Sequence, residues 1–389
     1  MATHSTFAER RDQIMQQPLE QVALAAPSGM FAKESVHPYV GFVERTRQPT
    51  NVDEDDLVNY GFGPGTLIRE PKEDEVVIGV FGGSVAYFFV RDGGIDALWE
   101  ELQKDPTYAG KTLRLVATGT PGFKQPQQLM ALNYLLSLGA HFDIIVNIDG
   151  FNEVALPKSE NVERGTFAFF PRNWSRRVDY LNLDPKMRLA LHPILQQAER
   201  RQSLAQTFQL PLLRHSMTAS LLWNVLDVTT VWQLKRSQTA LSSLKEVSHD
   251  SYVATGPVQE YEDDDAFFAD LVEVWQRSSQ LMHSIAGSIG AEYIHVLQPN
   301  QYVENSKPMT EEEKAIALNP GHPYQRDAKS GYPKLQAAGK ELAEEGVHFY
   351  DLTMIFQDTE GQIYRDWCCH YNERGNEILG RAIGRAMDR

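Results

Sequence analysis

The sequence predicts an α/β protein of flavodoxin-like type, which is a three-layer α/β/α sandwich around a five-stranded parallel sheet, with a mainly helical insertion. Two observations support this fold class. Short, continuous apolar runs alternate with stretches of helical periodicity, as is typical of parallel strands buried on both faces. Several of these runs end directly in glycine-rich or polar turns, where strands of such sheets lead into helices. The length of 389 residues is sufficient for one enlarged α/β domain or for two domains.

The first three expected strands follow an N-terminal segment of different character. Residues 1–75 are punctuated by glycine and proline and lack a long periodic pattern, so we expect an irregular N-terminal arm. The next expected elements are strands at 76–81, 112–118 and 142–149 and helices at 85–104 and 125–138.

The alternation stops after residue 154 and resumes near residue 263. Segment 155–262 begins with a loop containing proline and arginine and continues with helical stretches, so we expect an inserted lid subdomain. The acidic run at 260–265 has no companion histidines and is expected to be a solvated linker. The body then comprises 76–154 and 263–389. Its remaining expected elements are helices at 266–289, 333–345 and 373–388 and strands at 292–298 and 347–353.

Charge and hydropathy exclude several classes of partner. The chain has 37 Lys and Arg against 52 Asp and Glu, a net charge of −15, which disfavours binding to nucleic acid and to anionic membranes. No apolar stretch reaches about 18 residues, and the first residues are polar, so we expect no stable membrane insertion and a cytoplasmic location. Adjacent Cys368 and Cys369 are expected to be buried free thiols rather than a strained vicinal disulfide.

Candidate catalytic residues follow the expected strands, because ligand sites in open parallel sheets lie beyond the carboxyl ends of the strands. Ser84 follows Gly82 and Gly83 at the start of a helix, where a tight turn exposes a nucleophilic hydroxyl. The alternative is a serine that only caps the helix. The GVFGGS turn does not match dinucleotide-binding or P-loop patterns.

A nucleophilic hydroxyl needs a base and a site that stabilises the oxyanion. His370 follows the last expected strand and is accompanied by Asp366, whereas His295 lies inside an apolar strand and is expected to be a core histidine. The Gly122 N–H and the Asn152 amide are candidate oxyanion donors. Each such donor is typically worth about a hundred- to a thousandfold in rate.

As a set, these turns resemble the sequence blocks of the SGNH (GDSL-like) hydrolase superfamily, in its large bacterial branch of esterases. VVIGVFGGSVA, ATGTPGFKQPQQL, IDGFNE and DWCCHYNERGN match the blocks that carry Ser84, Gly122, Asn152 and His370. The resemblance implies a catalytic triad or dyad in which Ser84 attacks an ester carbonyl and His370 acts as general base and then acid. It also implies an oxyanion hole formed by the Ser84 N–H, the Gly122 N–H and the Asn152 side chain.

The sequence departs from the family pattern at two positions. Ala117 stands where the second block usually opens with asparagine. The family's acid normally precedes its histidine by three residues, but that position is Trp367 here, and Asp366 precedes His370 by four. Asp366 therefore either reaches the imidazole through a local bulge or leaves a Ser–His dyad.

The resemblance implies a hydrolase that removes a short acyl group, such as acetyl, from a carbohydrate-like ester through an acyl-enzyme. No metal or organic cofactor is expected, and the partner is a small-molecule or glycan ester. Gly83 and Glu153 are further candidates for substrate binding, and Arg172 is expected on an exposed loop or in a sugar or anionic acyl site. The alternatives are an O-acyltransferase of the same fold and a catalytically silent glycan- or partner-binding protein. Such relatives are often envelope-associated, which makes the cell envelope or periplasm the alternative location.

Overall fold

The computed structural model describes residues 4–16, 34–44, 60–62, 68–178, 185–245 and 252–387. The chain divides into two compact units. One consists of residues 1–34 and 176–255, and the other of residues 35–175 and 256–389.

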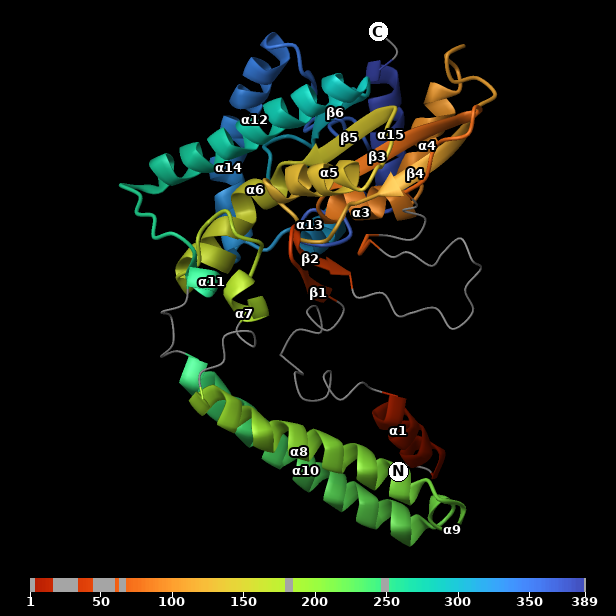
Figure 1. Ribbon diagram of the computed structural model, residues 1–389, viewed down its shortest axis with the longest axis vertical. Helices are drawn as coiled ribbons and strands as arrows, with labels where there is room; N and C mark the ends of the chain where they lie inside the picture. The colour runs from red at the N-terminus through yellow and green to blue at the C-terminus, as the bar shows by residue number, and fades with distance from the viewer. Residues whose placement is uncertain are drawn as a thin grey trace. The chain divides into compact units, whose positions relative to one another are not determined.

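The larger unit is a three-layer α/β/α sandwich around a parallel sheet (Figure 1). Its strands are β3 (Glu75–Gly82), β4 (Thr112–Ala117), β5 (Ile144–Asp149), β6 (Glu292–Leu297) and β7 (His348–Asp351). The order β4-β3-β5-β6-β7, parallel throughout, is that of a flavodoxin-like sheet, which confirms the predicted fold class. Strands β3, β5 and β6 are almost wholly buried, which explains their continuous apolar runs.

Two groups of helices flank this sheet. In the first group, α15 packs on α3 and α4, and in the second, α12 contacts α5, α6 and α14. The helices of these groups are α3 (Ser84–Arg91), α4 (Gly94–Leu102), α5 (Gln127–Ser137), α6 (Phe151–Leu156), α12 (Asp264–Ile289), α14 (Pro323–Glu344) and α15 (Glu373–Met387). Helix α6 continues into a π-turn and a 3₁₀ turn. The short helix α7 begins in this unit and ends in the smaller one, the short α11 belongs to the smaller unit, and the short α13 belongs to the larger one. The bounds of these five pieces are Pro157–Asn161, Val162–Arg164, Trp174–Val178, Tyr252–Thr255 and Glu311–Ala317.

Three elements of the larger unit differ from the expected ones. The helix expected at 85–104 is interrupted at Gly93, whose φ of +82° is left-handed and ends one helix before the next begins. Helix α14 begins ten residues earlier than expected, with Pro323 in its first turn, because Pro333 is accommodated inside the helix. Residues from 155 to 175, expected to open the insertion, belong to the sheet unit.

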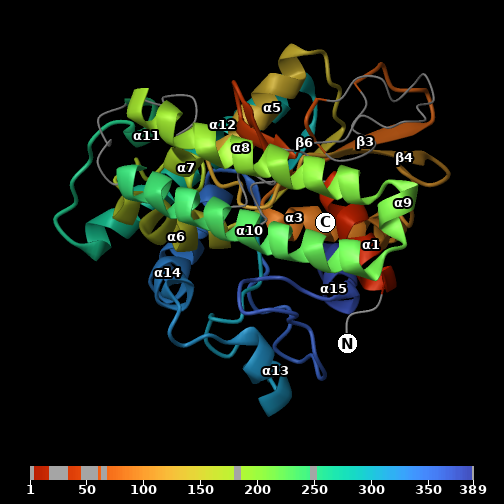
Figure 2. The ribbon, with the colours of Figure 1, turned by 90° about the horizontal axis from the view of Figure 1, so that it is seen from below.

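The smaller unit is helical. It contains α1 (His4–Gln16), α8 (Pro185–Phe208), α9 (Pro211–Arg214) and α10 (Met217–Lys245), and α8 and α10 lie side by side (Figure 2). Helix α1 contacts both of them. No helix in the described ranges is long and apolar enough to span a membrane.

The N-terminal residues correct the expectation of a wholly irregular arm over 1–75. Helix α1 is held by tertiary contacts, since the ring of Phe7 meets Trp223 edge-on at 6.3 Å and Arg10 pairs with buried Asp227 at 2.5 Å. Strands β1 (Glu34–His37) and β2 (Gly41–Glu44) pair with each other, and β2 contributes to the core of the sheet unit. Residues 1–3, 17–33, 45–59 and 63–67 of the expected arm lie outside the described residues.

Candidate active site

The turn after β3 presents Ser84 at the start of α3. Gly82 in this turn has a φ of +140°, and a Cβ added to it would lie 2.1 Å from the carbonyl oxygen of Ile148 on β5. Only glycine therefore lets the end of β3 approach β5 this closely. The hydroxyl of Ser84 consequently lies beyond the carboxyl end of the sheet, where the sequence predicted it.

Ser84, His370 and Asp366 form one hydrogen-bonded chain. The distance from Ser84 Oγ to His370 Nε2 is 2.7 Å, and that from His370 Nδ1 to Asp366 Oδ2 is 2.5 Å. An ionised carboxylate can only accept, so Nδ1 carries the proton and Nε2 is left to accept from the serine hydroxyl. This is the arrangement in which an imidazole can remove a proton from a nucleophilic serine.

The loop from Asp366 to His370 explains how an acid four residues away reaches the imidazole. The second carboxylate oxygen, Oδ1, accepts from the backbone N–H groups of Cys368 at 2.9 Å and Cys369 at 3.2 Å, so the chain folds tightly around the carboxylate. The Arg365 N–H donates to the carbonyl of His370 at 3.1 Å and closes the loop. This turn accommodates the additional residue between Asp366 and His370. The loop thus has the local bulge that was one of the two alternatives for Asp366.

The charge of Asp366 is maintained by the same contacts. Burial acts to raise the pKa of this carboxyl, but the hydrogen bond and charge of His370 and the backbone donors outweigh it and hold the pKa below its ordinary value. Asp366 is therefore an ionised acceptor at neutral pH, as orientation of the imidazole requires.

Residues after β6 hold the loop in place, and the sequence did not point to them. The side-chain amide of Gln301 donates to the carbonyls of Asp366 at 3.3 Å and Cys368 at 3.1 Å. The hydroxyl of Tyr302 donates to the carbonyl of Trp367 at 2.5 Å. Gln301 and Tyr302 follow the apolar strand β6 within a few residues, and all strands of this parallel sheet end at the same edge. This position was the signal in the sequence that could have indicated them.

The ring of Phe88 provides a wall for the imidazole. Its centroid lies 5.0 Å from that of His370 at an interplanar angle of 72°, an edge-to-face contact. The guanidinium of Arg365 covers the same ring at 3.7 Å and is paired with Asp92 at 2.8 Å. Phe88 thus restricts rotation of His370 from the side of α3.

The expected oxyanion donors lie around Ser84. In the described part of the chain, neither the Ser84 N–H nor the Gly122 N–H donates to another protein atom. Asn152 Nδ2 donates to the carbonyl of Phe123 at 2.7 Å, which uses one of its two hydrogens and leaves the other. A Cβ on Gly83 would lie 2.1 Å from Asn152 Nδ2, so Gly83 allows the amide to approach the peptide that precedes Ser84.

Arg172 lies against Gly122, one of the expected oxyanion donors. Gly122 has a φ of +86°, and a Cβ added there would lie 1.9 Å from Arg172 Cδ. Glu160 binds the guanidinium through two contacts of 2.7 Å, and the Tyr324 hydroxyl donates to the same carboxylate. Burial opposes the charge of Arg172, but Glu160 outweighs it and raises the arginine pKa. Arg172 is thus part of a buried cluster rather than an exposed basic loop.

For the esterase that the sequence predicts, replacing Gly122 by alanine is expected to reduce kcat about 10²- to 10³-fold, the usual effect of losing one oxyanion donor. The new methyl group must displace either Arg172 or the Gly122 N–H. Gly110→Ala is the matched control, because Gly110 also has a positive φ, of +77°, but has nothing within 4 Å of an added Cβ. The activities of both variants are measured by steady-state kinetics. Equal activities would contradict a role of Gly122 in the site.

Glu153 lies inside the body, which does not fit the expected contact with substrate. Its carboxylate accepts from the backbone N–H of Gly150 at 2.8 Å, from the N–H of Gln125 at 3.0 Å and from the amide of Gln128 at 3.1 Å. Burial and the charge of Asp149 raise its pKa to about 8. Glu153 therefore fastens the start of α6 and keeps Asn152 in position.

His295 is the buried core histidine that the sequence predicted. Its Nε2 lies 2.9 Å from Asp149 Oδ1 and its Nδ1 lies 2.7 Å from Ser279 Oγ, and all three side chains are buried. This second Ser–His–Asp chain is sealed in the core, where no substrate reaches it. A serine, a histidine and an aspartate in sequence thus indicate a candidate site only where the fold leaves them accessible.

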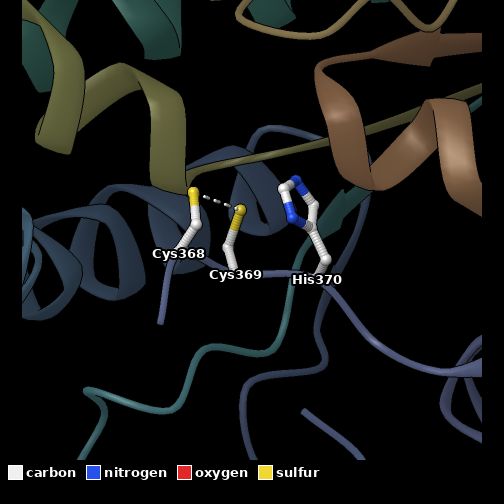
Figure 3. A group of neighbouring side chains, drawn as sticks. All are labelled: Cys368, Cys369 and His370. Atoms are coloured by element: carbon white, nitrogen blue, oxygen red, sulfur yellow. Dashed lines mark hydrogen bonds between the residues drawn. The ribbon is translucent and has the colours of Figure 1, made fainter. Parts of the chain in front are cut away.

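The two cysteines are free, as expected. Cys369 is buried, whereas Cys368, which was also expected to be buried, is only half-buried. Their sulfur atoms lie 3.4 Å apart, beside the imidazole of His370 (Figure 3). Among the described residues, these three form the one group of His, Cys, Asp or Glu side chains that could hold a metal ion.

The acidic run at 260–265 forms no such group among the described residues. Its Asp263 caps α12, and its Asp264 pairs with Lys158.

Comparison with known proteins finds no match, either to a family model or to a curated protein. A functional assignment therefore has to rest on the chemistry of the site, namely the chain of Ser84, His370 and Asp366 and the donors around it.

Proposed function

We propose that this protein is a serine esterase of the SGNH hydrolase type, which cleaves a carboxylic ester through an acyl-enzyme on Ser84. The observation that carries the proposal is the continuous hydrogen-bonded chain from Ser84 Oγ through His370 to Asp366, with distances of 2.7 and 2.5 Å. Such a chain at the carboxyl edge of a parallel sheet is what activation of a serine hydroxyl requires.

The steps follow from the atoms of this chain. His370 Nε2 takes the proton of Ser84 as Oγ attacks the ester carbonyl, and Asp366 stabilises the imidazolium that forms. Collapse of the tetrahedral intermediate expels the alcohol, which receives the proton from Nε2. Water activated by the same nitrogen then attacks the acyl-enzyme, and the carboxylic acid leaves with Ser84 restored.

The oxyanion of each tetrahedral intermediate would be bound by the N–H groups of Ser84 and Gly122 and by the second hydrogen of the Asn152 amide. The two backbone donors have no other protein partner among the described residues. They need no reorganisation when the negative charge develops, which is why such donors lower the barrier so strongly.

The surroundings of Ser84 favour a short acyl group on a carbohydrate-like alcohol. Ser84 is 8% exposed, and Arg172 with its buried partners occupies the space beside Gly122, so little room remains for a long acyl chain. Trp367, next to Asp366, is 37% exposed, and its ring lies 4.3 Å from that of His322. A partly exposed aromatic surface of this kind suits the apolar face of a sugar ring.

The test is covalent labelling with a fluorophosphonate probe, together with hydrolysis of p-nitrophenyl acetate. The wild-type protein is expected to be labelled once, and Ser84→Ala is expected to remain unlabelled and inactive. Ser137→Ala, at an exposed position on α5, is the control and should behave like the wild type. Unchanged labelling of Ser84→Ala would overturn the assignment of the nucleophile.

The two alternatives give different results in the same assays. An O-acyltransferase would transfer the acyl group to an added sugar faster than to water. A silent binding protein would show no labelling but saturable binding of a glycan. The contact between Asp366 and His370 supports the esterase over the silent alternative, because the offset of Asp366 does not keep its carboxylate from the imidazole.

A further inference from the structure

Two thiols stand beside the proposed general base, and the mechanism uses neither of them. Cys368 and Cys369 lie within the loop that joins Asp366 to His370, and the Cys369 thiol also interacts with the hydroxyl of Ser84. In Figure 3 the sulfur of Cys369 lies between that of Cys368 and the imidazole of His370. One ligand atom from each of these three residues lies within 4.8 Å of the other two.

We propose that Cys368, Cys369 and His370 bind a soft divalent cation of the zinc class, and that this cation inhibits the enzyme. Two thiolates and an imidazole are the ligands that zinc and cadmium select, whereas magnesium and calcium select oxygen ligands. A water molecule would take the fourth position. The inhibition rests on the proposed function, but the binding itself does not.

The spacing of the sulfur atoms fits a metal ion better than a disulfide. In a tetrahedral site with zinc–sulfur bonds of about 2.3 Å, two sulfur atoms lie roughly 3.8 Å apart. The observed 3.4 Å thus needs only a small rotation of the side chains. A disulfide would require the atoms to approach to about 2.05 Å, in a strained ring between neighbouring residues. The contacts of Gln301 and Asp366 with this loop oppose such a change of the backbone.

Binding of the ion would stop catalysis whichever nitrogen of His370 it takes. Nε2 is the atom that removes the proton from Ser84, and Nδ1 is the atom that bonds to Asp366. A metal bond at either nitrogen removes one of these links, so the imidazole no longer acts as an oriented base. Each thiol releases its proton to solvent when the ion binds, and no electron is transferred.

Direct binding is tested with the purified full chain after treatment with a chelator. Titration with Cd²⁺ is expected to give a thiolate-to-metal absorption band that saturates at one equivalent, and Co²⁺ should give the visible bands of a tetrahedral site. Ser84→Ala is expected to bind both ions as the wild type does. Cys368→Ser and Cys369→Ser are each expected to weaken binding at least about 100-fold. Because Cys368 is half-buried, Cys368→Ser gives the decisive result if Cys369→Ser does not fold.

Inhibition is tested by comparing ester hydrolysis with Zn²⁺ and with EDTA, each variant being normalised to its own rate in EDTA. Zn²⁺ is expected to lower the wild-type rate more than about tenfold, reversibly, and to change the rate of Cys368→Ser less than about twofold. Absence of a saturable thiolate band in the wild type overturns the site, even if the esterase is active. Equal inhibition of wild type and Cys368→Ser overturns the mechanism of inhibition. A band in a protein without esterase activity supports the site and refutes the proposed function instead.

Discussion

His370→Ala is expected to lower kcat for ester hydrolysis by about 10⁵- to 10⁶-fold, the loss seen when a serine hydrolase loses its general base. Without the imidazole, the Ser84 hydroxyl keeps its proton and is a weak nucleophile, and nothing donates a proton to the leaving alcohol. The residual rate would come from the oxyanion donors and from substrate binding. The measurement is steady-state hydrolysis of p-nitrophenyl acetate, with the thermal midpoint of each variant recorded to show that it is folded.

His192→Ala is the matched control, because His192 is an exposed histidine of α8 and belongs to the other structural unit. It should retain the wild-type rate. A loss of less than about tenfold in His370→Ala would assign the base to another residue and would contradict the chain from Ser84 to Asp366.

Asp366→Asn is expected to lower kcat by about 10³- to 10⁴-fold with little change in KM. Asparagine keeps the shape of the carboxylate but can present an N–H to Nδ1, which then has to accept and places the proton on Nε2, the wrong tautomer for a base. The carboxylate accepts at 2.5 Å from Nδ1, so the substitution changes the shorter of the two links in the chain.

The control for this variant is Asp358→Asn, an exposed aspartate between β7 and the loop of Asp366. It should leave kcat unchanged. An Asp366→Asn variant with wild-type kcat would show that the site works as a Ser–His dyad, in which the imidazole is oriented without a carboxylate.

The fold could be predicted well from the sequence because its signals are local. A strand buried on both faces must be apolar along its whole length, and β3, β5 and β6 show this directly. The turns after the strands carry glycines, and their positions indicated the edge at which Ser84, Gly122 and Asn152 lie. The exceptions depend on distant contacts. Helix α1 was missed because it is held by contacts with α8 and α10, such as that of Phe7 with Trp223, which lie far away in the sequence.

The candidate site also depends partly on local sequence signals and partly on contacts between distant segments. Residue types and their positions after strands are properties of short segments, so they identified the nucleophile candidate Ser84 and the base candidate His370. Their hydrogen bond joins residues 286 positions apart, and no local pattern shows that it forms. Whether an acid four residues before His370 reaches it depended on how the loop folds around the carboxylate of Asp366. Likewise, only the structure shows that Glu153 makes its hydrogen bonds inside the body, to the backbone of Gly150 and Gln125, and so fastens a helix there. The sequence therefore specified the sheet and the chemical groups at its edge, whereas their distances and accessibility arise from packing between distant segments.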